Sequence, residues 1–126
     1  MNKALWSAQV LLGFAFLMGG GMKMVTPHEA LAADMSWVTH VPAAVVKLIG
    51  LLEVLGAFGL ILPSALRIKP WLTPLAAAGL LLTMLSAAAV HIAIGEAHMI
   101  APPFVLGALA TFIAWGRYKR HPISAK

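Results

Sequence analysis

The chain has 126 residues, of which 61% are hydrophobic and only 10% are charged, so it is far more apolar than a soluble domain of its size. This length allows a single domain, residues 1–126, and leaves no room for a large soluble core beside several membrane spans. The absence of cysteine excludes structural disulfides, thiol relays and iron–sulfur clusters held by thiolates. The net charge of +5 comes from basic residues near the ends of apolar segments, without interleaved aromatic residues, so we expect no nucleic-acid partner.

The first apolar segment, residues 4–24, is long enough to cross a bilayer as a helix. The three glycines 19–21 near its end suit close contact with another helix in lipid. A signal peptide cleaved near residues 30–32 is the alternative. The apolar run is too long for a typical signal-peptide core, and a polar stretch separates it from that cleavage site, so we favour a span.

A short helix is expected between the first two spans, from about Pro27 to Met35. Thr26 is a suitable N-cap, Pro27 suits the first helical position, and Glu29 would complete a capping box. Trp37 follows, and an aromatic side chain of this kind anchors a segment at the membrane interface. We therefore expect an interfacial helix here.

The second span is expected over residues 42–62, with Pro63 as its stop. It carries a carboxylate, Glu53, near its middle, where a charge is costly in lipid. Gly50 and Gly56 lie three residues to either side, on the same helical face as Glu53. Small residues let a neighbouring helix approach closely, so Glu53 should face other helices and not lipid.

The third span is expected over residues 74–94, with Thr73 as N-cap and Gly95 as its end. The fourth and shortest span, residues 102–116, begins at two prolines and runs into a basic tail. Short connections give an up-down order. The predicted fold class is therefore all-α: an integral membrane bundle of four antiparallel helices with a short interfacial helix between spans one and two.

Four spans place both termini on one side, together with the turn between spans two and three. That side collects seven of the nine basic residues: Lys3, Arg67, Lys69, Arg117, Lys119, Arg120 and Lys126. All four acidic residues are expected in the other half of the bundle, away from the termini. The positive-inside rule then predicts cytoplasmic termini, in a bacterial inner membrane. A three-span alternative would separate the basic tail from the basic turn, which the same rule disfavours.

The outer half of this bundle contains the candidate binding or proton-handling residues. Glu53 lies roughly 15 Å below the outer end of span two at 1.5 Å per residue. Lys23 and His91 fall near the outer ends of spans one and three, and Lys47 lies about a turn and a half into span two. We expect Glu53 to pair across helices with Lys23 or His91, because Lys47 projects from a different face of the same helix.

Alternatives remain open at each of these positions. Lys23 and Lys47 could instead extend their ammonium groups to the interface, which we favour for both. Glu53 could be a protonated packing residue bonded to a backbone carbonyl or to Gln9. His91 and His98 do not have the spacing of a helical metal site, and Gly95 interrupts the helix between them, so we assign no metal. We assign no catalytic residue either, because no serine or threonine has a recognisable His–acid partner.

The pattern Gly50-Leu51-Leu52-Glu53-Val54-Leu55-Gly56, followed by Leu60-Ile61-Leu62-Pro63, resembles the DoxX-like family of small membrane proteins. The likeness extends over nearly the whole chain, through residues 19–23, Pro74, His91 and residues 101–103. The resemblance implies a four-helix integral membrane protein. The family name derives from a quinone-linked sulfur-oxidising complex, and members are often called oxidoreductases, but the resemblance carries no agreed set of catalytic residues.

Three function classes follow. The first is a subunit or accessory of a membrane redox system, which rests mainly on the resemblance and for which a quinone is one candidate cofactor. The second is a non-enzymatic carrier or binder of a small lipophile that uses Glu53 as a titratable contact. The third is a scaffold without a ligand. Besides the lipid bilayer we expect a homo-oligomer or a membrane partner subunit, because Gly- and Ala-rich helices offer surfaces for association.

Overall fold

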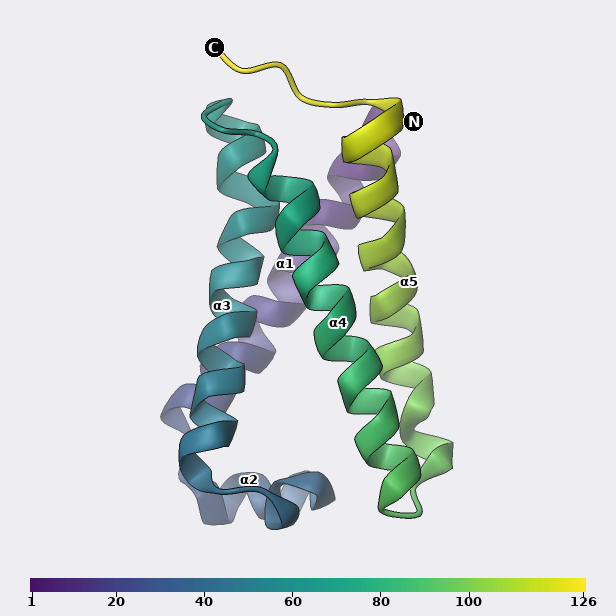
Figure 1. Ribbon diagram of the computed structural model, residues 1–126. Coiled ribbons are helices and arrows are strands. Elements are labelled where there is room, and N and C mark those ends of the chain that lie inside the picture. The colour runs from purple at the N-terminus through teal and green to yellow at the C-terminus, as the bar shows by residue number, and fades with distance from the viewer.

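The computed structural model describes residues 1–126 and contains four long helices in antiparallel order. They are α1 (Asn2–Val25), α3 (Ala43–Leu66), α4 (Leu72–Ala93) and α5 (Ala101–Trp115), which continues through a π-helical turn η3 (Gly116–Arg120). Both termini lie at one end of the bundle, and α2 (His28–Asp34) crosses the other end (Figure 1). A short 3₁₀ turn η1 (Ser36–His40) follows α2, and another, η2 (Ala97–Ile100), precedes α5. The all-α fold with four spans is confirmed.

The helices pack as two pairs. Helix α1 lies mainly against α3, and α4 lies mainly against α5, while α3 and α4 join the pairs. The pairs stand close at the end that holds the termini and diverge toward α2 (Figure 1). All four long segments are long and apolar enough to cross a membrane. The chain is thus a membrane protein in contact with the bilayer.

The core lies between the four helices and is small. Its largest members are Leu12, Phe16, Leu60, Leu80 and Ile113. Many other large apolar side chains, such as those of Leu11, Phe14 and Phe104, are exposed on the outside of the bundle. Such an apolar exterior would be unfavourable in water and is suited to contact with lipid chains.

A second apolar cluster fixes the segment between α1 and α3. Leu31 of α2, Val38 of η1 and Val46 of α3 are buried together. Because η1 is held against the start of α3, its residue Trp37 lies at the end of the bundle opposite the termini. This crossing segment is where the sequence predicted an interfacial helix.

Two expected helix ends were wrong. Pro63 does not stop the second span, because α3 continues through it to Leu66. Thr73 is not an N-cap, because α4 begins at Leu72 and the Thr73 hydroxyl donates to the carbonyl oxygen of Gly59 at 3.1 Å. Proline at 63 has no N–H for the carbonyl four residues earlier, which is that of Gly59. Thr73 replaces the missing donor, so the helix continues past the proline.

The capping box proposed before α2 does not form. Pro27 occupies the N-cap position itself, and neither Thr26 nor Glu29 makes a side-chain capping bond. Gly95 does follow the end of the third span, as predicted: α4 ends at Ala93, and Gly95 has a φ of +83°. Glycine adopts this left-handed conformation without the steric penalty of a Cβ, which suits it to ending a helix.

Candidate binding site

The buried carboxylate of α3 is paired with a lysine of α1. The Nζ atom of Lys23 donates to Oε1 of Glu53 at 2.7 Å, and the Glu53 residue is only 3% exposed. The two helices come close here because Gly20 and Gly50 face one another. A Cβ built on Gly20 would lie 2.6 Å from the carbonyl oxygen of Gly50. The expectation that small residues on the Glu53 face admit a neighbouring helix is therefore met, and that helix is α1.

This geometry corrects two expectations. Lys23 does not extend to the interface, since its ammonium group turns inward to Glu53. Gln9 is not the partner of Glu53, because its amide nitrogen donates to the carbonyl oxygen of Leu60, farther along α3. Lys47 is exposed and makes no side-chain hydrogen bond, and its extension to the interface stays a prediction.

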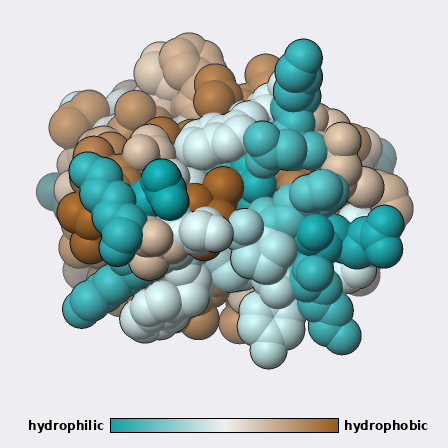
Figure 2. Space-filling model, turned by 90° about the horizontal axis from the view of Figure 1, so that it is seen from above, coloured by the Kyte–Doolittle hydropathy of each residue, from teal (hydrophilic) through white to brown (hydrophobic).

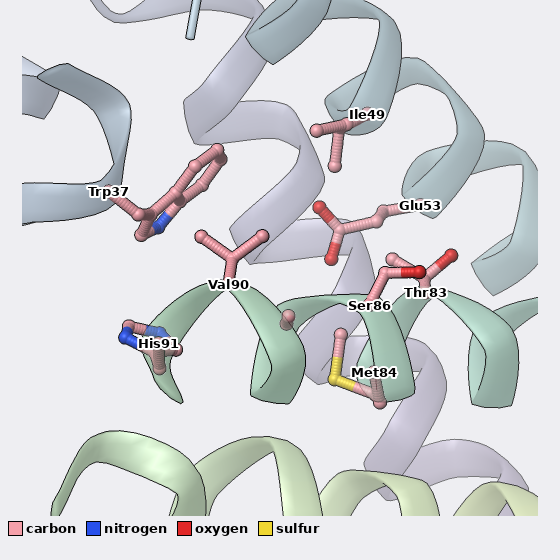
Figure 3. Close-up of a pocket in the computed structure, with 9 residues that line it drawn as sticks. Trp37, Ile49, Glu53, Thr83, Met84, Ser86, Val90 and His91 are labelled. Atoms are coloured by element: carbon pink, nitrogen blue, oxygen red, sulfur yellow. The ribbon is translucent and has the colours of Figure 1, made fainter. Parts of the chain in front are cut away.

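A cavity of about 240 Å³ opens beside Glu53, between α3 and α4. Its walls come from α3, α4 and the η1 turn, and most of them are apolar (Figure 3). The lining residues are Trp37, Ile49, Glu53, Thr83, Met84, Ser86, Ala87, Val90 and His91. Glu53 from α3 and His91 from α4 thus contribute to one cavity, together with the indole of Trp37. No other carboxylate lines it.

The polar groups of α4 in this cavity are partly occupied. The hydroxyls of Thr83 and Ser86 donate to carbonyl oxygens of their own helix, those of Gly79 and Leu82. A hydroxyl oxygen that donates in this way can still accept a hydrogen bond. The α4 wall therefore offers acceptors to a ligand, and Glu53 offers a carboxylate on the facing wall.

His91 contacts Glu96 and not Glu53. Its Nδ1 lies 3.2 Å from Oε1 of Glu96, and the hydroxyl of Ser36 donates to the other Glu96 oxygen. The Ser36 hydrogen bond, followed by the contact with His91, holds the pKa of Glu96 below its ordinary value. Glu96 therefore joins the crossing segment, through Ser36, to the end of α4, and it orients His91 at the cavity. Nowhere do three His, Asp or Glu side chains come together as a metal site.

A second polar cluster lies at the opposite end of the bundle, and the sequence reasoning missed it. The guanidinium of Arg117 donates from Nε to Oε1 of Gln9 at 2.6 Å and from Nη1 to Oδ1 of Asn2 at 2.7 Å. Antiparallel threading already brings the start of the first span beside the end of the fourth. The signal was available in a polar residue inside span one and an arginine directly after span four.

The comparisons with known proteins identify a family. The model of the DoxX-like family matches residues 7–113, and the chain therefore belongs to this family. Comparison with curated proteins and with solved structures gives no match.

Proposed function

We propose that this member of the DoxX-like family binds a small lipophilic molecule with a polar head in the cavity beside Glu53, as a subunit or accessory of a quinone-linked redox system. The proposal places the protein in a bacterial inner membrane with both termini in the cytoplasm. The observation that carries it is the position of Glu53: a carboxylate in the middle of a membrane span that lines a mainly apolar cavity. Ionisable groups at such depth mark ligand or proton pathways by default.

The size of the cavity limits the ligand. Sites for drug-sized molecules measure about 300–1,000 Å³, and this cavity has about 240 Å³. It suits a single ring with small substituents, and an attached hydrocarbon tail would have to extend into the lipid between α3 and α4. A quinone has this form. The tryptophan at residue 37 offers a flat apolar surface against which a ring can pack.

The polar groups favour the reduced form of such a ring. Glu53 accepts hydrogen bonds when it is ionised, and its pairing with Lys23 stabilises that form. Nδ1 of His91 faces the Glu96 carboxylate, so its proton belongs on that nitrogen and Nε2 is an acceptor in the neutral ring. Hydroquinone hydroxyls are donors, whereas quinone carbonyls are acceptors. We therefore expect tighter binding of the hydroquinone.

Trp37 provides a direct test. In a variant that keeps Trp37 and replaces the other three tryptophans by phenylalanine, a short-chain ubiquinone analogue in nanodiscs should quench the remaining fluorescence in a saturable way. Ala87→Leu should fill the cavity and abolish saturation. Ala89→Leu adds the same volume on an exposed position of α4 and should leave it unchanged. Quenching that rises linearly and equally in both variants would contradict the proposal.

Glu53→Gln then tests the role of the carboxylate. Glutamine keeps an oxygen that can accept from Lys23, so we expect the fold to survive. Its loss of charge should weaken hydroquinone binding more than quinone binding, measured with the same Trp37 signal under reducing and oxidising conditions. Equal binding of both redox forms, and of a ring without oxygen substituents, would favour a lipophile binder without a redox role.

A further inference from the structure

The end of the bundle that holds the termini contains a buried arginine without an acidic partner. Arg117 is 3% exposed, and the acceptors of its hydrogen bonds are the neutral oxygens of Gln9, Asn2 and the carbonyl of His121. Its remaining nitrogen, Nη2, is buried and has no partner. A buried charge without a counter-ion is costly, and a guanidinium has five donors to satisfy. The Arg117 guanidinium therefore has one free donor and no acidic partner within the chain, and an external anion could supply both the acceptor and the negative charge.

A large polar cavity adjoins this arginine. It measures about 650 Å³, and its walls include Asn2, Trp6, Ser64, Arg67, Arg117 and His121. The Trp6 ring centre lies 5.4 Å from the Arg117 guanidinium carbon and covers one side of it. Arg67 reaches the cavity from the turn between α3 and α4, and its Nε donates to the carbonyl oxygen of Ser124 at 2.8 Å. Two guanidinium groups therefore share one cavity.

The surrounding charge has a single sign. Seven basic residues lie at the end of the bundle that holds the termini: Lys3, Arg67, Lys69, Arg117, Lys119, Arg120 and Lys126. The four acidic residues belong to α2, the middle of α3 and the loop after α4, all away from the termini. Hydrophilic side chains cover much of the face seen from this end (Figure 2). Such a field attracts anions toward the cavity.

We propose that this cavity binds the phosphate group of an anionic lipid, with Arg117 and Arg67 as its ligands. The guanidinium fork matches the oxygen geometry of a phosphate and can bond it through two nitrogens. A lipid is the favoured source because the cavity lies where two membrane spans end and where Trp6 and Trp115 mark an interface. A soluble phosphate has the same chemistry and is distinguished by the experiment.

The test uses the purified full chain and native mass spectrometry with two lipids, phosphatidylglycerol and phosphatidylcholine, and inorganic phosphate as a third probe. The wild-type protein should retain phosphatidylglycerol saturably and in preference to phosphatidylcholine. Arg67→Gln should weaken this retention about tenfold, the effect of losing one hydrogen bond between charged groups. Lys119→Gln removes the same charge from an exposed position outside the cavity and should have no such effect.

Arg117→Lys keeps the charge at the buried position but not the fork, and should weaken retention as much as Arg67→Gln. Because that variant could fail to fold, Arg67→Gln against Lys119→Gln decides the question alone. Equal loss in those two variants would mean diffuse surface charge and would overturn the site, as would an absence of retention. Binding of inorganic phosphate with the same variant pattern, and no preference for phosphatidylglycerol, would keep the oxyanion site but overturn the lipid as its source.

Discussion

Lys23 and Glu53 form an ion pair of 2.7 Å that joins α1 to α3 within the membrane-spanning part of the bundle. The pair is asymmetric: the Glu53 side chain is 4% exposed and that of Lys23 is 14% exposed. The carboxylate has less contact with solvent than the ammonium group, so loss of the partner should cost more free energy when the carboxylate is the group left behind. This dependence can be measured as a coupling free energy.

We expect Lys23→Met to destabilise the protein by about 3–5 kcal/mol, because it leaves a buried carboxylate without a partner. Glu53→Leu should also destabilise it. The double variant Lys23→Met/Glu53→Leu should recover most of the loss, since it removes both charges and keeps the apolar volume. Unfolding in mixed micelles with increasing SDS gives the free energies for all four proteins. Strictly additive effects of the two single substitutions would show that the pair is not coupled.

The Gly20–Gly50 contact carries the second prediction. A Cβ on Gly50 would lie 2.6 Å from the carbonyl oxygen of Gly20 and 2.8 Å from Cβ of Lys23. Backbone atoms cannot move aside as a flexible side chain can, so Gly50→Ala should separate α1 from α3 and lengthen the Lys23–Glu53 bond. We expect a loss of about 1–3 kcal/mol, the usual cost of overpacking, in the same unfolding assay.

Gly21→Ala is the matched control for this substitution. Nothing lies within 4 Å of a Cβ built on Gly21, which directly follows Gly20 in α1, the helix that Gly50 of α3 contacts. Alanine is the better helix former by about 1 kcal/mol, so this variant should be neutral or slightly more stable. If Gly21→Ala destabilised the protein as much as Gly50→Ala, the close approach of the two helices would not be the cause.

The sequence predicted the spans, and it predicted that Glu53 would pair across helices with Lys23 or His91, because both expectations follow from composition and depth; it did not choose Lys23, which it placed at the interface. Apolar length defines the spans, and antiparallel threading places Lys23 and Glu53 in the same half of the bundle. The partner of His91 could not be found in this way. Glu96 follows the Gly95 turn, and its position beside His91 depends on the path of that turn and on the crossing segment that carries Ser36.

The link made by Glu96 should depend on pH. Its pKa lies below the ordinary value because Ser36 and His91, with His98 nearby, favour the ionised carboxylate. A lowered folded-state pKa means that the contact stabilises the protein above the ordinary Glu value and is lost as the pH falls through the lowered one. In the variant that keeps only Trp37, emission should therefore shift as the crossing segment loosens in acid.

Glu96→Gln should remove this acid transition, because the side chain no longer titrates. Glu29→Gln changes the same type of residue on α2, where the carboxylate makes no hydrogen bond, and should leave the transition in place. An acid transition that persists unchanged in Glu96→Gln would show that another group controls the crossing segment.

The hydroxyl of Thr73 supports the proline in α3. Thr73 is fully buried, donates to the Gly59 carbonyl oxygen that Pro63 leaves without a helical partner, and lies 2.7 Å from the Ser64 hydroxyl. Thr73→Val keeps the shape and removes the donor. An unsatisfied buried carbonyl costs about 1–3 kcal/mol, so we expect a loss of this size in unfolding free energy. Thr73→Ser should restore most of it.

Thr111→Val removes a hydroxyl whose acceptor, the Gly107 carbonyl, belongs to its own helix, and it should cost much less. Equal losses in Thr73→Val and Thr111→Val would show that Gly59 does not depend on Thr73 and that the proline is tolerated for another reason.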